Sequence, residues 1–356
     1  MASAPMTTAP YGPGPSYAPI TPTPPGPTRR HHPVGTAPLD VGILRNTIIP
    51  SLKLHSGLAV FAYAAGRATN RLETKDWLWP TGQVASVWWS AVGRHLVRGA
   101  SLSTVWQTMN RTETLLLTGV TLWGGRLFYR IAQRSVQRRG DEPRYEAVKK
   151  DSGFWNKALF TVYLPEALFQ AVICLPFTIP FRHQAIGSLL PSSPEWVNAA
   201  AVGLFSAGFA LEVLADWQLD QFKRENAGAE SRMCRDGVWS LVRHPNYLGD
   251  ALVHFSFPLL LYAAGMLSPI ELLGPVANYV FLRYVGGDRE NEESQEARYL
   301  RDNPEKKVDL DRYRQTKNSF WPDVRQITNK WAWIVVGCGL AGAALEKATR
   351  LAATQI

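Results

Sequence analysis

The sequence contains few of the features that soluble enzymes and disulfide-stabilised domains commonly use. Only three cysteines occur in 356 residues, Cys174, Cys234 and Cys338, and none belongs to a CxxC pair. Their wide spacing indicates neither a disulfide framework nor a structural zinc site, and we expect no metal centre. The chain also lacks a glycine-rich turn between a strand and a helix, so a Rossmann-type dinucleotide site is not predicted.

Charged residues are scarce as well, at 19% of the chain, against roughly 25% in ordinary globular domains. The charges that are present fall between apolar blocks, as they do in polytopic membrane proteins. A net charge of +9 can indicate nucleic-acid binding, but no zinc-finger spacing or basic–aromatic groove accompanies it here. We therefore expect the chain to associate with a membrane and not with nucleic acid.

Residues 1–38 contain no acidic residue and eleven of the 25 prolines. Such a segment cannot bury a core, so a disordered, proline-rich tail is expected. It has no apolar stretch of the kind that forms a secretory signal. The absence of acids beside Arg29 and Arg30 is shared with mitochondrial transit peptides, although the proline density argues against an amphipathic helix.

The apolar residues form blocks that predict an all-α, polytopic membrane protein. A membrane-spanning helix takes about 20 residues, with ~17 as the lower limit, and the third, fourth and fifth blocks satisfy this length. With the shorter blocks included, we expect about seven transmembrane helices in a domain covering residues 39–330. Residues 331–356 contain one more apolar segment, expected to form a short interfacial or packing helix. The seven blocks cover residues 48–66, 84–98, 112–132, 156–180, 194–214, 250–266 and 269–285.

The basic residues of the loops predict the orientation of these helices. The loop 130–150 is strongly basic, and basic loops remain on the cytosolic side of a membrane. Counting the blocks from there places residues 215–249, and everything from residue 286 onward, on the same side. The three most charged loops therefore share one face, where cytosolic cofactor-binding loops are expected.

Polar side chains occur at helical spacing inside three of the blocks. Asn246, Asp250 and His254 are separated by four residues each and share one helix face. Pro245 precedes them, in a position where proline is tolerated in the first turn of a helix. Polar residues this close to an apolar block can be helix ends wetted by the membrane interface, or they can line a cavity.

The fifth block ends in a similar stripe that contains Glu212 and Asp216, with Gln218 nearby. The fourth block carries Glu166 and Gln170, again four residues apart. An ionisable side chain in the hydrocarbon region costs several kcal/mol, so such groups usually face a cavity, a partner or a substrate. The third block ends in Arg126 and Arg130, which can reach the interface by snorkelling.

The motif residues resemble a known family. The stretch 237–250, GVWSLVRHPNYLGD, is similar to the G-L-W-x-x-x-R-H-P-N-Y-x-G-E signature of membrane proteins related to steroid 5α-reductases, many of them described only as domains of unknown function. Three further stretches agree in order with that family. The R-H-P-x-Y-x-G part alone is shared with isoprenylcysteine and phospholipid methyltransferases. The further stretches are 122–145, 212–223 and 313–323.

This resemblance implies a seven-helix membrane fold that binds NADPH from the cytosolic side and reduces a carbon–carbon double bond of a steroid or other lipid. By motif position, Asp216, Asn246 and Asp250 are expected to contact the cofactor, with Arg243 and Tyr247 close by. The predicted cofactor-binding set is Glu212, Asp216, Gln218, Arg243, His244, Asn246 and Asp250. Gln170 and His254 are expected to border the substrate cavity.

Reduction of such a bond needs an acid beside the substrate, and two residues are candidates. Tyr247 has a hydroxyl next to the motif asparagine, and Glu166 becomes a proton donor if burial keeps it protonated. The pyrophosphate of the cofactor would be bound by arginine and lysine side chains of the loops, because no glycine-rich turn is present.

Two departures from the family leave alternatives open. Asp250 stands where the family more often has glutamate, and the segment 287–313 is longer and more charged than its counterpart. A methyltransferase that uses S-adenosylmethionine, or a non-catalytic membrane protein of the same fold, therefore remain alternatives. The expected location is the endoplasmic reticulum membrane, with a mitochondrial membrane as the alternative.

Overall fold

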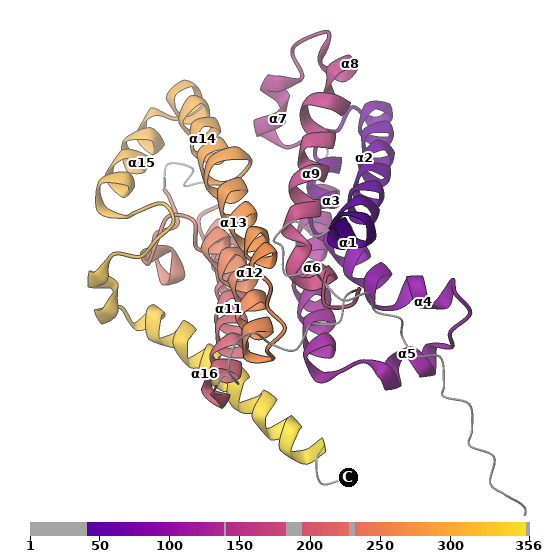
Figure 1. Cartoon of the computed structure of the whole chain (residues 1–356). Helices are drawn as coiled ribbons and strands as arrows, with labels where there is room; N and C mark the ends of the chain where they lie inside the picture. Colours follow the sequence, from indigo (N-terminus) through magenta and orange to yellow (C-terminus); the bar gives the residue numbers. More distant parts are fainter. Residues whose placement is uncertain (1–40, 139, 183–193, 228–231, 354–356) are drawn as a thin grey trace, which may run out of the picture. The chain divides into compact units, whose positions relative to one another are not determined.

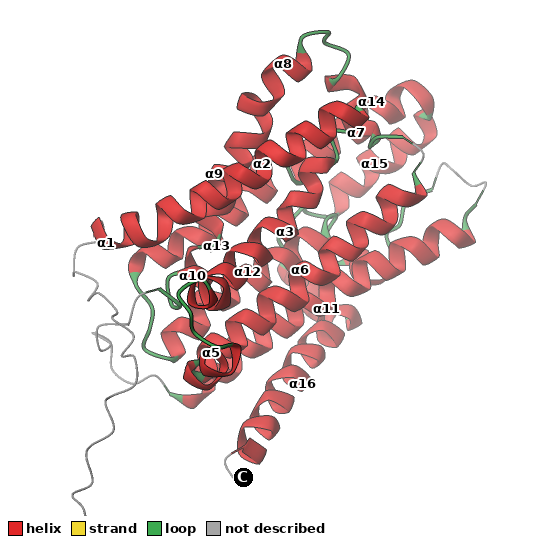
Figure 2. Cartoon of the chain, turned by 90° about the vertical axis from the view of Figure 1, so that its right-hand side faces the viewer, coloured by secondary structure: helices red, strands yellow, loops and turns green. Residues whose placement is uncertain are grey.

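The described part of the chain is all-helical. The computed structural model describes residues 41–138, 140–182, 194–227 and 232–353, and within these ranges every regular element is a helix and no strand occurs (Figure 2). The all-α prediction is therefore confirmed. The predicted tail, residues 1–38, lies outside the described residues.

Within the described residues, three helices are long and apolar enough to cross a membrane. They cover Leu44–Thr69, Glu195–Glu225 and Lys330–Ala353, and they indicate an integral membrane protein. The last of them contains the segment that we expected to form a short interfacial or packing helix. At 24 residues, it is about 36 Å long at the usual rise of an α-helix.

The first half of the chain forms one group of packed helices. Helix α2 (Ile49–Thr69) packs on α3 (Thr74–Trp88) and α9 (Leu164–Ile173), and α3 also packs on α6 (Arg111–Gln137) (Figure 1). Shorter elements connect these four helices. They are α1 (Val41–Ile43), η1 (Leu44–Ile48), η2 (Trp89–Gly93), α4 (Arg94–Leu96), α5 (Leu102–Thr108), α7 (Pro143–Val148), α8 (Phe154–Ala158), η3 (Leu159–Tyr163) and α10 (Leu175–Thr178).

The second half forms a second group around α11 (Glu195–Glu225). Helices α12 (Pro245–Ala263) and α16 (Lys330–Ala353) both pack on α11, and α13 (Leu273–Val280) connects this group to α9. Helices α14 (Asp288–Asp302) and α15 (Pro304–Thr316) pack on each other at one end of the group (Figure 1). The remaining elements are η4 (Gly237–Ser240), η5 (Pro269–Leu272), η6 (Phe281–Val285) and η7 (Val324–Thr328).

Local sequence signals explain several helix boundaries. Asn110 and Glu113 form a reciprocal capping box at the start of α6, and Pro245 occupies the first turn of α12 as predicted. The charged segment that we expected to be an enlarged loop is instead mostly the helices α14 and α15. Asn303 caps α15 by accepting the N–H of Lys306 at 3.0 Å, which ends one helix and begins the next.

Helices α11 and α12 approach each other closely at two glycines. A Cβ on Gly208 would lie 2.6 Å from the Gly249 carbonyl oxygen, and a Cβ on Gly249 would lie 2.6 Å from the Gly208 carbonyl oxygen. Small residues also face each other between α11 and α16, where a Cβ on Gly339 would lie 2.7 Å from the Gly203 carbonyl oxygen. Such small-residue contacts let membrane helices pack backbone to backbone.

We predict that Gly208→Ala destabilises the protein, because the added methyl group meets the backbone of α12 and not a movable side chain. Overpacking of this kind costs about 1–3 kcal/mol. Gly125→Ala on α6 is the matched control, since nothing lies within 4 Å of a Cβ at that position. Thermal unfolding of the detergent-solubilised variants tests this expectation, and equal melting temperatures for both would contradict it.

Candidate functional site

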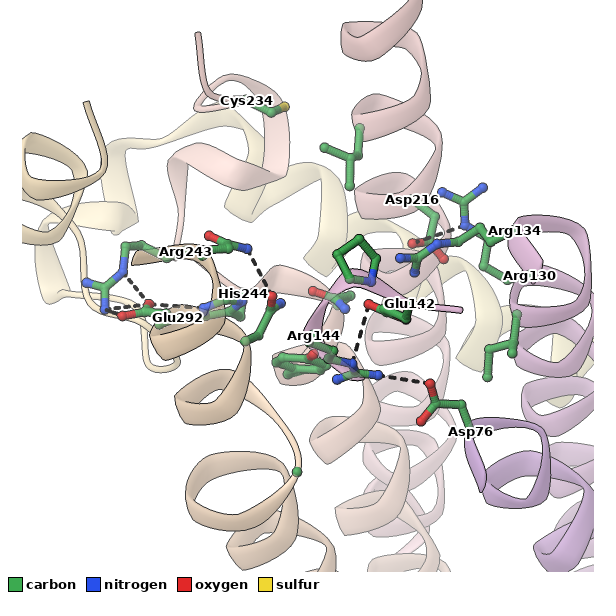
Figure 3. Close-up of a pocket in the computed structure, with 18 of the residues that line it drawn as sticks. Asp76, Arg130, Arg134, Glu142, Arg144, Asp216, Cys234, Arg243, His244 and Glu292 are labelled. Carbon is green, nitrogen blue, oxygen red and sulfur yellow. Dashed lines mark hydrogen bonds and ion pairs between the residues drawn. The ribbon is translucent and has the colours of Figure 1, made fainter. Parts of the chain in front are cut away.

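A cavity of about 790 Å³ lies between the two helix groups and is lined by residues of α3, α6, α7, α9, α11, α12, α14 and α15. Most of the residues predicted from the sequence line it together. They are Glu166, Glu212, Asp216, Arg243, His244, Asn246, Tyr247 and Asp250. Residues far apart in the sequence therefore meet around one space, part of which is drawn in Figure 3.

Three predicted residues do not line this cavity. Gln218 accepts the backbone N–H of Val238 at 2.8 Å and lies against Gly237, whose φ is +67°. It therefore holds the turn before the motif. Gln170 and His254, which we expected to border the substrate cavity, are buried behind its wall.

Arginines of α6 pair with carboxylates of α11. Arg126 forms ion pairs with Glu212 and Asp216, and its NH2 group donates to the Glu212 carbonyl oxygen at 2.8 Å. Arg130 pairs with Asp220 and approaches Asp216, with 3.5 Å between Nε and Oδ1. The two arginines are thus bound within the protein rather than extended to the membrane interface. Asp216 is already neutralised before any ligand binds.

Two neighbouring side chains hold the Asp250 carboxylate in one orientation. Its Oδ1 accepts a hydrogen bond from Asn278 Nδ2 at 2.9 Å, and His254 Nδ1 lies 3.0 Å from the same oxygen. His254 Nε2 in turn lies 3.1 Å from Gln83 Oε1, and its ring contacts Trp123 edge-on. Asn278 and Gln83 were not predicted, because neither lies in the motif and only the packing of α3 and α13 brings them here.

Glu292 of α14 binds the arginine and histidine of the motif. It accepts from Arg243 Nε at 2.8 Å and from Arg243 NH2 at 3.0 Å, and His244 Nε2 lies 3.0 Å away. Arg314 Nε of α15 donates to it at 3.2 Å. These contacts fasten α14 and α15 to the start of α12, and Figure 3 shows the arginine and histidine turned toward Glu292.

The pKa of Glu292 reflects this cationic environment. Burial alone would raise it, but the hydrogen bonds and charges of His244 and Arg243 lower it to about 2. Glu292 was not predicted as a site residue. The only signal in the sequence was the density of acidic residues between 288 and 302, which does not distinguish one of them from another.

The opposite wall carries a second charged cluster, from α3, α7 and α9. The Tyr145 hydroxyl donates to Asp76 Oδ1 at 2.6 Å, and Arg144 NH2 donates to Asp76 Oδ2 at 3.0 Å. Lys75 Nζ lies 3.7 Å from Glu166 Oε2. A carboxylate beside a buried ammonium group can accept or release a proton near bound substrate. In the sequence, the features that indicate this cluster are the polar run 73–76 and the basic loop 130–150.

The lining of the cavity combines two kinds of side chain. Arg134, Lys223 and Arg232 line it, and no acidic side chain of the described residues lies within ion-pair distance of these three. The rings of Trp79 and Phe281 also line it, and they stack with 4.3 Å between their centroids. The described lining residues therefore present cations that form no ion pair, together with a flat apolar surface, to one ligand space.

We predict that Glu292→Gln lowers the melting temperature at pH 7, because Arg243 and His244 lose their charged acceptor. Hydrogen bonds to charged groups contribute about 1.5–3 kcal/mol each. The pKa of Glu292 lies below the ordinary 4.5, so its contribution is complete above pH 4.5 and is lost as the pH falls toward 2. The difference between wild type and variant should shrink over that range.

Glu293→Gln is the control for this experiment, since Glu293 is exposed and its ion pair among the described residues is with exposed Arg289. Thermal unfolding across pH in detergent measures both variants. A difference between wild type and Glu292→Gln that stays constant down to pH 2 would refute the role of the carboxylate charge.

Comparison with known proteins identifies the family. A family model described as a protein of unknown function, DUF1295, matches residues 62–309. Neither the curated proteins nor the solved structures contain a match. The matched region begins in α2 and ends in α15, so it includes the predicted motif residues and both charged walls of the cavity. This agrees with the resemblance to membrane proteins related to steroid 5α-reductases. The chain belongs to the DUF1295 family.

Proposed function

We propose that this protein is a membrane-embedded, NADPH-dependent reductase of a carbon–carbon double bond in a steroid or other lipid. The observation that carries the proposal is the composition of the cavity. It joins the motif residues Asn246, Tyr247 and Asp250 to cations that form no ion pair among the described residues and to a pair of stacked aromatic rings. A phosphate-bearing cofactor and an apolar substrate need these two environments side by side.

The cation-rich part suits a dinucleotide phosphate. Arg134, Lys223 and Arg232 have no acidic partner among the described residues, so their charges are available for phosphate oxygens. S-adenosylmethionine has no phosphate and carries a sulfonium charge, which these side chains would repel. A volume of about 790 Å³ also lies in the usual range of ligand pockets.

NADPH, when bound, supplies the hydride. Asp250 is held by Asn278 and lines the cavity, so it can accept a hydrogen bond from an amide of the cofactor. Tyr247 and Glu166 line the cavity from α12 and α9. Each can donate a proton toward the oxygen of a conjugated carbonyl as negative charge develops there.

The position of the charged helices supports a proposed placement in the membrane. Helices α7, α14 and α15 lie at one end of the molecule (Figure 1) and contain the charged segments expected on the cytosolic side. We propose that about seven helices span the membrane, that the cofactor enters from the cytosol, and that the endoplasmic reticulum is the host membrane. The substrate would reach the Trp79–Phe281 end from the lipid.

We predict that calorimetry on the detergent-solubilised protein detects NADPH binding, and that Asn246→Ala weakens it about tenfold, the equivalent of one hydrogen bond. Gln221→Ala is the control, since Gln221 is exposed on α11, does not line the cavity and donates a hydrogen bond to Glu225. Binding of S-adenosylmethionine instead would indicate a methyltransferase. Binding of neither ligand would indicate a non-catalytic protein of the same fold.

We also predict that Lys223→Ala and Arg134→Ala weaken NADPH binding more at low salt than at high salt, because phosphate contacts are screened by ions. Titrations at two ionic strengths measure this effect. Lys330→Ala is a charge-matched control, because Lys330 begins α16 and does not line the cavity. Equal losses of affinity for all three variants would show that net charge, and not these positions, determines binding.

A further inference from the structure

The chain from residue 317 to residue 333 connects α15 to α16 and carries large apolar side chains on its outside (Figure 1). It comprises an irregular part, the short helix η7 and the first turn of α16. Exposed apolar side chains that lie together mark interaction surfaces. The exposed fractions are 44% for Trp321, 88% for Val324, 68% for Ile327 and 58% for Trp333.

The local fold places three of these side chains together. η7 is a 3₁₀ helix, in which residues three positions apart lie on the same edge. Val324 and Ile327 therefore form one apolar edge. The Asp323 carboxylate caps this helix by accepting the N–H of Arg325 at 2.9 Å. The Trp333 indole N–H donates to the Ile327 carbonyl oxygen at 2.7 Å, which holds the indole next to η7.

Contacts on either side of η7 fix the orientation of the segment. Phe320 is buried in the core of the second helix group, with 5.2 Å between its ring centroid and that of Tyr279. The Trp321 indole N–H donates to the Tyr279 hydroxyl at 3.2 Å. Asn329 Nδ2 donates to Ser240 Oγ at 2.9 Å. Both ends are therefore held by the protein, and the apolar edge between them is left exposed.

The same segment is paired with the sequence motif. The backbone N–H of Arg243 donates to the Asn318 carbonyl oxygen at 3.0 Å, and that of His244 donates to the Ser319 carbonyl oxygen at 2.9 Å. Arg243 and His244 both line the cavity. A surface that positions the segment therefore also positions the motif.

Continuity with α16 indicates what covers the apolar edge. This helix is long and apolar enough to cross a membrane, and it begins at Lys330, shortly after Ile327. Tryptophan and basic side chains are typical of the level where a membrane meets water. Arg325 and Lys330 lie between Trp321 and Trp333 in the sequence. Lipid that surrounds the outward face of α16 therefore reaches the edge of η7 without a break. Exposed apolar side chains of that face are Ile334, Val336 and Leu340.

We propose that the segment 317–333 is an interfacial anchor, which lies in the headgroup layer of a phospholipid membrane. The edge of Val324 and Ile327 enters the boundary between headgroups and acyl chains, at the depth typical of interfacial elements. Arg325 and Lys330 remain at the level of the lipid phosphates, which attract them. Because the segment is paired with the backbone of the motif, the membrane surface passes at the level of the motif.

The test is spin-label accessibility in the full-length protein, reconstituted into liposomes of phosphatidylcholine and phosphatidylserine. A nitroxide on an added cysteine is probed with oxygen, which concentrates in hydrocarbon, and with a water-soluble nickel chelate. We expect labels at Val324→Cys and Ile327→Cys to be more accessible to oxygen than to nickel. Leu300→Cys is the matched control, since Leu300 is 67% exposed on the charged helix α14 and should give the opposite order.

Leu340→Cys supplies the reference for depth, because Leu340 lies ten residues after the start of α16, about 15 Å along the helix. The oxygen-to-nickel ratio at the edge should lie between the ratios at Leu300 and Leu340. All variants carry Cys338→Ala, and the signal of this parent is subtracted. Cys174 and Cys234 are buried. Monodisperse elution in detergent verifies folding.

Three outcomes would overturn the proposal. A ratio at Val324 and Ile327 equal to that at Leu300 would show that the edge faces water. Low accessibility to both reagents would show that a protein partner or a second copy covers it. A ratio equal to that at Leu340 would place the edge inside the hydrocarbon and not at its boundary. No nucleotide is present, so the outcome is independent of the proposed reductase activity.

Discussion

The ion pairs between α6 and α11 are the interaction on which the site depends. Arg126 and Arg130 bind Glu212, Asp216 and Asp220, and these carboxylates lie on a helix apolar enough to cross a membrane. Charges in such surroundings are tolerated only when they are paired. The pairing fixes the spacing of the two helix groups beside the cavity. Among the described residues, Arg134, Lys223 and Arg232 of the same wall form no ion pair.

The polar residues around the cavity divide into those that hold the structure and those that face the ligand space. Arg243 and His244 belong to the first kind, because both side chains are bound by Glu292. Asp250 belongs to both kinds, with one oxygen bound by Asn278 and the side chain still lining the cavity. A motif residue can therefore be required for the structure of the site without contacting a ligand. The arginine and histidine position α14 over the cavity, and the asparagine and aspartate lie in its wall.

Some of the site could be predicted from the sequence, because helical spacing is a local property. Asn246, Asp250 and His254 do share one face of α12, with Pro245 in its first turn as expected. Helical spacing could not predict how far each side chain lies from the cavity. Its position relative to the cavity depends on neighbouring helices, which is why His254 faces Gln83 and not the ligand space.

The sequence by itself determined the helical class, the apolar segments and the face of the motif, since each follows from composition and from periods of a few residues. Only the tertiary structure decided which charges are paired. Glu292 meets Arg243 across 49 positions, and Asn278 meets Asp250 across 28. Hydrogen bonds and ion pairs act over a few ångströms in space, and the separation of two residues along the chain does not determine that distance.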